Sequence, residues 1–199
     1  MRVAAQGDRI GQETFDTETV DSRQYLEGTQ PAFDSIFLEY YSRIVAVLVR
    51  LVGNRARAEE LAEEVFLKLY QHPPRRSDQG HKVGGWLYRT ATHLGIDSLR
   101  AAARRKHYEE LATAEVSNVD TASDPLEDLQ RAESRQRVRT ALAQLRTIQA
   151  QLLILRYSGL SYKELAEALE LNPSSVGTLL ARAEAEFEKC YRELYGSEE

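Results

Sequence analysis

The residues with the clearest binding chemistry in this sequence lie between Trp86 and Lys106. A helix over this segment would place an aromatic ring, hydrogen-bonding groups and cations on one stripe: Trp86, Thr90, His93, Asp97, Arg100 and Arg104. Arg104, Arg105 and Lys106 also give the segment a basic end. Because unpaired bases stack on aromatic rings and phosphates attract Arg and Lys, the pattern suits single-stranded nucleic acid. An ordinary core helix with a solvated, charged end fits the same residues equally well.

Catalytic and metal-binding chemistry have little support. The four histidines form no i,i+4 pair and have no cysteine partners, so no metal site is predicted. The glycines at 80–85 lack the context of a phosphate-binding loop. The single cysteine, Cys190, follows an apolar helix face, which favours a packed thiol over a nucleophile. We therefore expect a protein that is not an enzyme and needs no cofactor.

The bulk composition indicates a soluble all-α protein. The chain has 199 residues, 42% of them hydrophobic and 29% charged, with only five prolines and eleven glycines. No stretch approaches the ~20 apolar residues of a membrane span, and the N-terminus lacks the apolar core of a signal peptide. A lone cysteine also agrees with a reducing compartment. These features predict a cytoplasmic location and no membrane insertion.

Charge is unevenly distributed along the chain, whose net charge is −5. Residues 31–110 carry 13 cations and 10 anions, whereas residues 111–135 carry two cations and six anions. The basic excess therefore coincides with the candidate nucleic-acid segment, and the acidic stretch reads as a linker. The predicted organisation is a flexible extension (1–30), a helical domain (31–108), a flexible acidic linker (109–131) and a second helical domain (132–195).

The first predicted domain contains three helical segments, at about 33–51, 57–71 and 86–106. Glutamates crowd the first half of the second segment, which the helix macrodipole alone would explain. They could also form a docking face for a basic partner helix. The basic residues of the loop at 75–85 either help to capture a nucleic-acid strand or are simply solvated.

The second predicted domain holds the most specific local pattern in the chain. Ser161 and Glu164 form a capping box, and Asn172–Pro173 supplies a helix cap followed by the residue best suited to the first helical position. Two helices joined by such a tight turn indicate a helix-turn-helix. A plain helical hairpin is the alternative.

Three segments in register make residues 33–194 resemble the extracytoplasmic-function (ECF) group of bacterial RNA polymerase sigma factors. These segments are AEELAEEVFLKLY (58–70), WLYRTATHLGIDSLR (86–100) and LRYSGLSYKELAEALEL (155–171). In that group the first segment docks on the largest polymerase subunit, the second captures and melts the promoter −10 element, and the third belongs to the −35-reading helix-turn-helix. The resemblance implies three partners: bacterial core RNA polymerase, promoter DNA and an anti-sigma factor.

The resemblance assigns site residues position by position. Core-polymerase binding falls to Glu60, Leu61, Glu63, Glu64, Phe66 and Lys68. Binding to the −10 element falls to Arg75, Arg76, Lys82, Trp86, Arg89, His93, Arg100, Arg104, Arg105 and Lys106. Binding to the −35 element falls to Ser161, Tyr162, Ser174, Ser175, Thr178 and Arg182.

The recognition helix departs from the family pattern. Its run SSVGTLLARAE (174–184) has Arg182 as its only cation, with Gly177 and Leu179 where the family places Lys or Arg. We therefore expect weak −35 recognition that depends on shape, and we expect the basic tail at 104–106 and the basic loop before the helix to provide the main grip on DNA. Two alternatives remain open: a helix-turn-helix regulator that does not act through core polymerase, and a sigma-like protein-interaction module.

Overall fold

A computed structural model describes residues 30–74, 81–112 and 125–196, and nearly all of these are helical, which confirms the all-α prediction. The predicted N-terminal extension lies outside the described residues except for Gln30. In chain order the elements are α2 (Gln30–Val52), α3 (Arg55–Gln71), α4 (His81–Ala112), α5 (Pro125–Gln144), α6 (Thr147–Tyr157), α7 (Tyr162–Leu169), the 3₁₀ turn η1 (Pro173–Ser175) and α8 (Val176–Tyr195).

The helices α2, α3 and α4 pack together around the apolar face of α2. The buried side chains include Ile44, Leu48 and Leu51 of α2 and Leu61, Val65 and Leu69 of α3. The chain reverses between the two helices at Gly53, whose φ of 74° favours glycine. The Asn54 side chain then accepts a hydrogen bond from the backbone N–H of Arg57 and caps α3.

Helix α4 begins five residues earlier than the sequence predicts and includes Gly84 and Gly85. A Cβ on Gly84 would lie 2.7 Å from the Tyr40 hydroxyl of α2, and a Cβ on Gly85 would lie 3.1 Å from Cα of Ala168 in α7. Two neighbouring helices therefore approach α4 closely on two sides. We attribute the extra helical turn to this packing, which offsets the propensity cost of about 1 kcal/mol per glycine.

The C-terminal half has the predicted helix-turn-helix. Ser161 and Glu164 form the expected capping box at the start of α7, with Glu164 Oε2 2.7 Å from the backbone nitrogen of Ser161. Helix α7 ends at Glu170, which is left-handed (φ 54°), and Asn172 caps the turn that leads into α8. Leu194 is 40% exposed because it lies in the last turn of α8.

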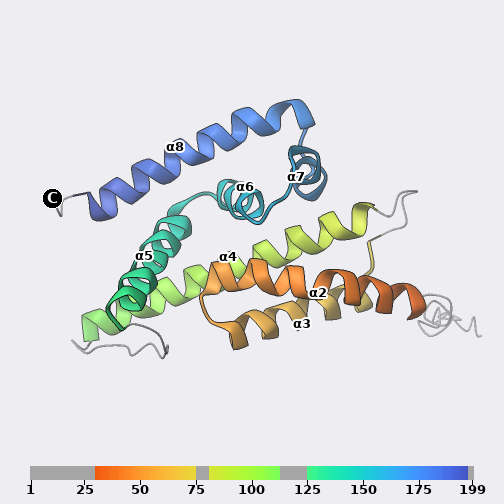
Figure 1. Cartoon of the computed structure of the whole chain (residues 1–199), viewed down its shortest axis with the longest axis horizontal. Coiled ribbons are helices and arrows are strands. Elements are labelled where there is room, and N and C mark those ends of the chain that lie inside the picture. Colours follow the sequence, from red (N-terminus) through yellow and green to blue (C-terminus); the bar gives the residue numbers. More distant parts are fainter. Residues whose placement is uncertain (1–29, 75–80, 113–124, 197–199) are drawn as a thin grey trace, which may run out of the picture.

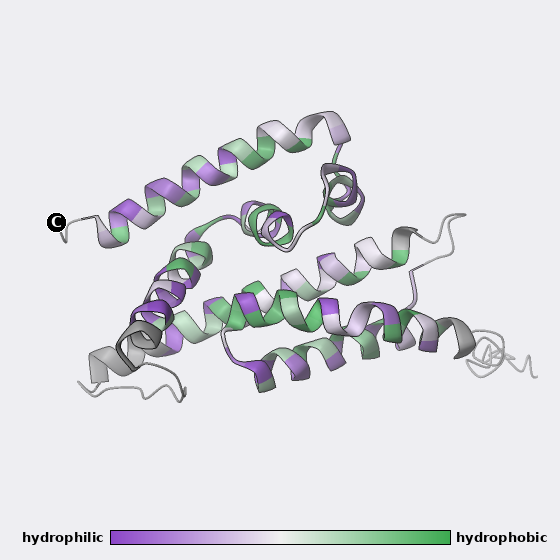
Figure 2. Ribbon diagram, viewed as in Figure 1, coloured by the Kyte–Doolittle hydropathy of each residue, from purple (hydrophilic) through white to green (hydrophobic). Residues whose placement is uncertain are grey.

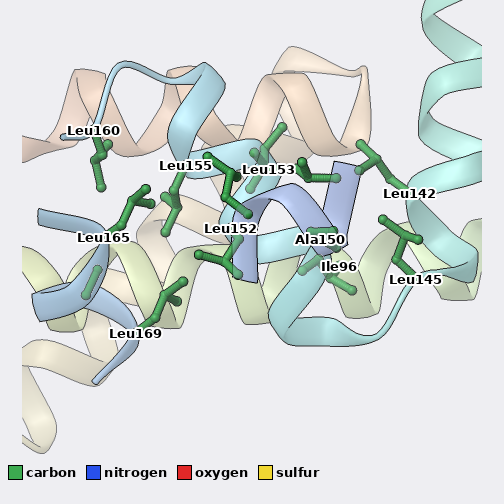
Figure 3. Close-up of a cluster of buried hydrophobic side chains, with 14 of the residues drawn as sticks. Ile96, Leu142, Leu145, Ala150, Leu152, Leu153, Leu155, Leu160, Leu165 and Leu169 are labelled. Atoms are coloured by element: carbon green, nitrogen blue, oxygen red, sulfur yellow. The ribbon is translucent and has the colours of Figure 1, made fainter. Parts of the chain in front are cut away.

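The two halves share one hydrophobic core. Val47 and Leu51 of α2 and Ile96 and Leu99 of α4 belong to the same buried cluster as the leucines of α6 and α7. Figure 3 shows Ile96 among side chains of the C-terminal half, next to Ala150. In Figure 1, α6 and α7 lie between α8 and α4. Residues 109–112 and 125–131, which were expected in the linker, belong to α4 and α5.

Hydropathy follows this arrangement. The middle of α2 and most of α6 are hydrophobic, whereas α5 and the C-terminal part of α8 are largely hydrophilic (Figure 2). No helix within the described residues combines the length and apolar character needed to cross a bilayer. The buried surface therefore lies between the helices.

Candidate nucleic-acid and polymerase interfaces

Helix α4 has two covered sides and one open stripe. Leu87 and Ala91 face the core formed with α2 and α3, while Ile96 and Leu99 face the core shared with α6 and α7. The stripe predicted from the sequence lies between these sides. Packing therefore leaves His93, Asp97 and Arg104 of this stripe exposed.

The open stripe combines one anchored aromatic ring with exposed polar groups. Trp86 is half-buried and packs against the α2–α4 core, which fixes its ring at the edge of the stripe. His93 and Asp97 are 62% and 57% exposed, and His93 Nε2 lies 3.5 Å from Asp97 Oδ2. Arg104 and Arg105 are exposed farther along α4. A stacked base and its phosphates would meet suitable partners along this stripe.

Arg100, predicted to bind DNA, instead clamps the turn between α5 and α6. Its Nε donates to the Ala143 carbonyl at 3.2 Å, one terminal nitrogen donates to the Leu145 carbonyl at 2.7 Å, and the other donates to Thr147 Oγ1 at 3.1 Å. These three contacts satisfy most of the planar fork of donors that a guanidinium presents. In this arrangement Arg100 is a structural tie between the two halves.

Arg89, also predicted to bind DNA, faces the C-terminal half as well. It forms an ion pair with Glu170, the residue that ends α7. One helical turn away, the buried Thr92 hydroxyl accepts a hydrogen bond from Gln151 Nε2 at 3.0 Å. Arg50 of α2 adds a 3.0 Å hydrogen bond to Ser158 Oγ at the end of α6. The interface between the halves therefore contains several polar contacts beside its apolar core.

A cluster of polar side chains joins α2, α4 and α7 near the start of α4. The rings of Tyr40 and Tyr88 meet edge to face, with centroids 6.2 Å apart. Burial raises the pKa of both tyrosines above the ordinary value, while Arg43 acts in the opposite direction. Hydrogen bonds from Ser161 lower the pKa of the Glu164 carboxyl, which also lies in the field of Arg43. The start of α7 thus lies close enough to Arg43 of α2 for a favourable charge interaction.

The docking face predicted on α3 needs a correction. Leu61 and Phe66 are only 2% and 3% exposed, because both point into the core between α2 and α3, so neither can contact a partner directly. The predicted polar residues of this helix do reach solvent: Glu60, Glu63, Glu64 and Lys68.

Sequence reasoning missed the apolar residue of this face. Leu67 is 53% exposed and lies on the same side of α3 as Glu60 and Glu63. The helical period could have predicted that Leu67 is exposed, because it falls outside the apolar line of Leu61, Val65 and Leu69. We call the exposed residues Glu60, Glu63, Glu64 and Leu67 the α3 face.

The predicted −35 residues lie around the helix-turn-helix, but several hydroxyls are already engaged. Ser161 Oγ bonds within the capping box, and Ser174 Oγ lies 2.8 Å from Asn172 Oδ1. The half-exposed Tyr162 ring lies 5.4 Å from the Arg156 guanidinium. Thr178 and Arg182 are exposed on α8, and Ser175 is half-buried. Thr178 and Arg182 are therefore the predicted side chains best placed to meet DNA.

A cavity next to α8 brings Arg182 together with two cations that the sequence did not assign to DNA binding. It has a volume of ≈ 680 Å³ and lies between the α5–α6 turn and α8. Arg146 lines it from the turn, and Arg182 and Lys189 line it from the helix. No sequence signal pairs Arg146 with Lys189, because the two are 43 positions apart and meet only in the folded chain.

Four predicted DNA-binding cations cannot be placed. Arg75 and Arg76 lie outside the described residues, and Lys82 and Lys106 belong to α4 without a described side chain. Among the described residues there is no group of three or more His, Cys, Asp or Glu side chains that could hold a metal ion.

Comparison with protein families gives two matches that fit this geometry. Residues 36–105, which span α2 to α4, match Sigma-70 region 2, and residues 135–187, which span the helix-turn-helix, match Sigma-70 region 4. The RNA polymerase sigma factor YlaC of Bacillus subtilis is 30% identical over 160 residues, covering 79% of this chain and 91% of YlaC. The chain belongs to the ECF group of RNA polymerase sigma factors.

Other relatives agree with this assignment of the sigma factor. The ECF sigma factor SigW of Bacillus subtilis is 27% identical over 86% of this chain and 95% of SigW. The sigma-H factor of Pseudomonas aeruginosa is 27% identical over 84% of this chain and 90% of that protein. The structure of CnrH in complex with the cytosolic domain of CnrY has the same fold (TM-score 0.53, 18% identity, 85% and 94% coverage).

The family defines the general role of this sigma factor. Sigma factors act in transcription initiation together with core RNA polymerase and promoter DNA, and they are not generally enzymes. The resemblance inferred from the sequence is thereby confirmed.

Proposed function

We propose that the sigma factor docks on core polymerase through the α3 face, melts and holds the −10 element with α4, and contacts the −35 element with the helix-turn-helix. The observation that carries this proposal is the open stripe of α4. Packing holds Trp86 in place, whereas His93 and Arg104 extend into solvent on the same stripe. A ring fixed beside exposed hydrogen-bonding groups and cations is suited to receive a base that has left the duplex.

The α3 face supports the docking step. Three glutamates surround Leu67, two of them paired with Arg57 and Lys68 of the same helix, so the face combines an apolar contact with a charged rim that has an acidic excess. A basic, partly apolar helix on the polymerase would complement both features. Leu61 and Phe66 support this face from beneath as core residues.

We infer that the two halves separate when the sigma factor works. The −10 and −35 elements lie about 25 base pairs apart, which is roughly 85 Å of duplex at ~3.4 Å per base pair. Helix α4 has 32 residues and is about 48 Å long, and α7 packs directly against it at Gly85. The packed halves therefore cannot reach both elements at once. We call the packed arrangement the closed form.

Three further points belong to the same proposal. The sigma factor has no catalytic step of its own and works in the cytoplasm, where the polymerase is. The segment between α4 and α5 connects the separated halves. We include an anti-sigma factor as a third partner; CnrH, which has the same fold, forms a complex with the cytosolic domain of CnrY.

Run-off transcription with core enzyme on genomic fragments tests the proposal. The wild-type chain should direct initiation at defined start sites. Leu67→Asp should reduce both pull-down of core polymerase and transcription by about tenfold or more, because it places a charge in an apolar contact. Leu194→Asp, which changes an exposed leucine on α8, is the matched control and should leave core binding unchanged. Transcription without dependence on the added chain would contradict the proposal.

A further inference from the structure

The closed form leaves the α3 face uncovered. Every buried residue of α3 belongs to the core that this helix forms with α2 and α4. In Figure 1, α2 and α4 lie between α3 and the helices α6 to α8. Leu67 is 53% exposed in this arrangement, and Glu60 and Glu63 are exposed beside it. Packing of the C-terminal half therefore does not hide the proposed polymerase contact.

The ion pairs of the α3 face are also independent of the C-terminal half. Glu60 pairs with Arg57 at 2.8 Å, and Glu64 pairs with Lys68 at 3.2 Å. Both cations belong to α3 itself. These carboxylates therefore have the same partners whether the halves are packed or separated, so the face should bind polymerase in either form.

The surfaces proposed to contact DNA are affected differently by closing. Arg89 of α4 pairs with Glu170, whose carboxylate gives it the kind of partner that a DNA phosphate would give. Arg100 is held by the α5–α6 turn, and the Thr92 hydroxyl is held by Gln151, so the side of α4 next to the open stripe is occupied. The packed halves also cannot reach the −10 and −35 elements together. Closing therefore interferes with promoter contact and not with docking.

Docking through the α3 face alone does not open the chain. A ligand that binds two forms equally well cannot shift the balance between them, however tightly it binds. Opening therefore needs a contact that only the separated halves can make, such as simultaneous contact with both promoter elements.

We propose that the closed form itself docks on core polymerase and that the resulting complex cannot melt a promoter. The inference rests on the proposed function, because it takes the α3 face as the polymerase contact. In this complex the ratio of open to closed chain, and not the occupancy of the polymerase, sets the rate of initiation. The sigma factor thus holds polymerase in an inactive state without an added inhibitor.

A reversible crosslink between the halves tests this proposal. Arg50 of α2 and Ser158 at the end of α6 meet at the closed interface, with Arg50 Nη1 3.0 Å from Ser158 Oγ, and neither belongs to a proposed binding surface. In a chain whose free cysteine is removed by Cys190→Ser, Arg50→Cys and Ser158→Cys would be joined by a bismaleimide that contains a reducible disulfide. The crosslinked chain should bind core polymerase within about tenfold of the uncrosslinked chain. It should melt about 100-fold less promoter, because losing one of two linked contacts costs about 10²–10⁴ in affinity. Cleavage of the crosslink by dithiothreitol should restore melting.

Two controls separate the effect of closing from that of the chemistry. Glu133→Cys/Arg137→Cys places the same crosslink within α5, where the two native side chains lie 2.8 Å apart, and should change neither core binding nor promoter melting. Adding Leu67→Asp to the chain crosslinked between its halves should abolish core binding, because the closed form docks through the α3 face.

Loss of core binding in the chain crosslinked between its halves, with binding retained in the α5 control, would overturn the proposal. Normal promoter melting by the crosslinked chain would also overturn it. So would failure of the two cysteines to crosslink, since the closed form would then not be populated. Failure of the wild-type chain to transcribe with core enzyme would instead refute the proposed function itself.

Discussion

Helices α4 and α8 both belong to the candidate DNA-binding surface, yet they differ in what they leave available. Helix α4 has an aromatic ring and several cations, but Arg89 and Arg100 are bound to the C-terminal half. Helix α8 is exposed along its outer face, but Arg182 is the only cation in its first three turns. Residue type alone therefore does not show which helix has side chains available to bind DNA. A side chain is available only if the folded chain does not already bind it.

The open stripe of α4 gives the largest expected effect. Trp86→Ala should lower the yield of melted promoter by about 5- to 160-fold, because one stacked base contributes about 1–3 kcal/mol. Fluorescence of a base analogue in the −10 element measures melting, and Trp86→Phe should keep most of the activity. A circular-dichroism melt of each variant controls for lost packing, since Trp86 also contacts the core. Normal melting by a folded Trp86→Ala chain would move strand capture away from α4.

The Arg100 clamp should have the next largest effect. Arg100→Ala removes three hydrogen bonds to the α5–α6 turn and should raise the ratio of open to closed chain at least about tenfold, since even one charged hydrogen bond contributes about 1.5–3 kcal/mol. Small-angle scattering of the free chain, or energy transfer between dyes on α3 and α8, would detect the opening. Arg104→Ala, which removes an exposed arginine one turn farther along α4, should cause no opening. Equal opening by both variants would show that general charge, and not the clamp, holds the halves together.

The ion pair between Arg89 and Glu170 should have the smallest effect. The two side chains are 35% and 72% exposed, and ion pairs in such settings contribute about 0–1 kcal/mol. A double-mutant cycle with Arg89→Gln and Glu170→Gln should therefore shift the open–closed ratio less than about fivefold, and the shift should shrink further at high salt. A larger, salt-resistant coupling would mean that this pair rivals the Arg100 clamp.

The sequence was sufficient for features that depend on local spacing. The capping box at Ser161 and Glu164 and the turn at Asn172 were predicted because their partners lie within three residues. The open stripe of α4 was predicted because a helical period places Trp86 and His93 on one face. These features need no knowledge of the tertiary fold.

Features that depend on distant partners were not predictable in this way. The carbonyl groups that hold Arg100 lie 43 and 45 residues away, and backbone carbonyls leave no residue-specific mark in a sequence. Similarly, the spacing on α3 places Leu61 and Leu67 on different faces but does not show which face α2 covers. The sequence therefore did not show that Leu61 and Phe66, which the resemblance assigned to polymerase binding, are buried.

The contact of Gly85 with Ala168 means that one substitution would change the stability of the closed form. A Cβ on Gly85 would lie 3.1 Å from the Ala168 backbone, which is closer than most Cβ contacts in proteins. One added methyl group would therefore push α4 and α7 apart. A single nucleotide change converts a glycine codon to an alanine codon. Paralogues with identical DNA-facing residues could thus differ in how readily they compete for a limited pool of polymerase. Their activation threshold would depend on one position at the α4–α7 contact instead of on the promoter.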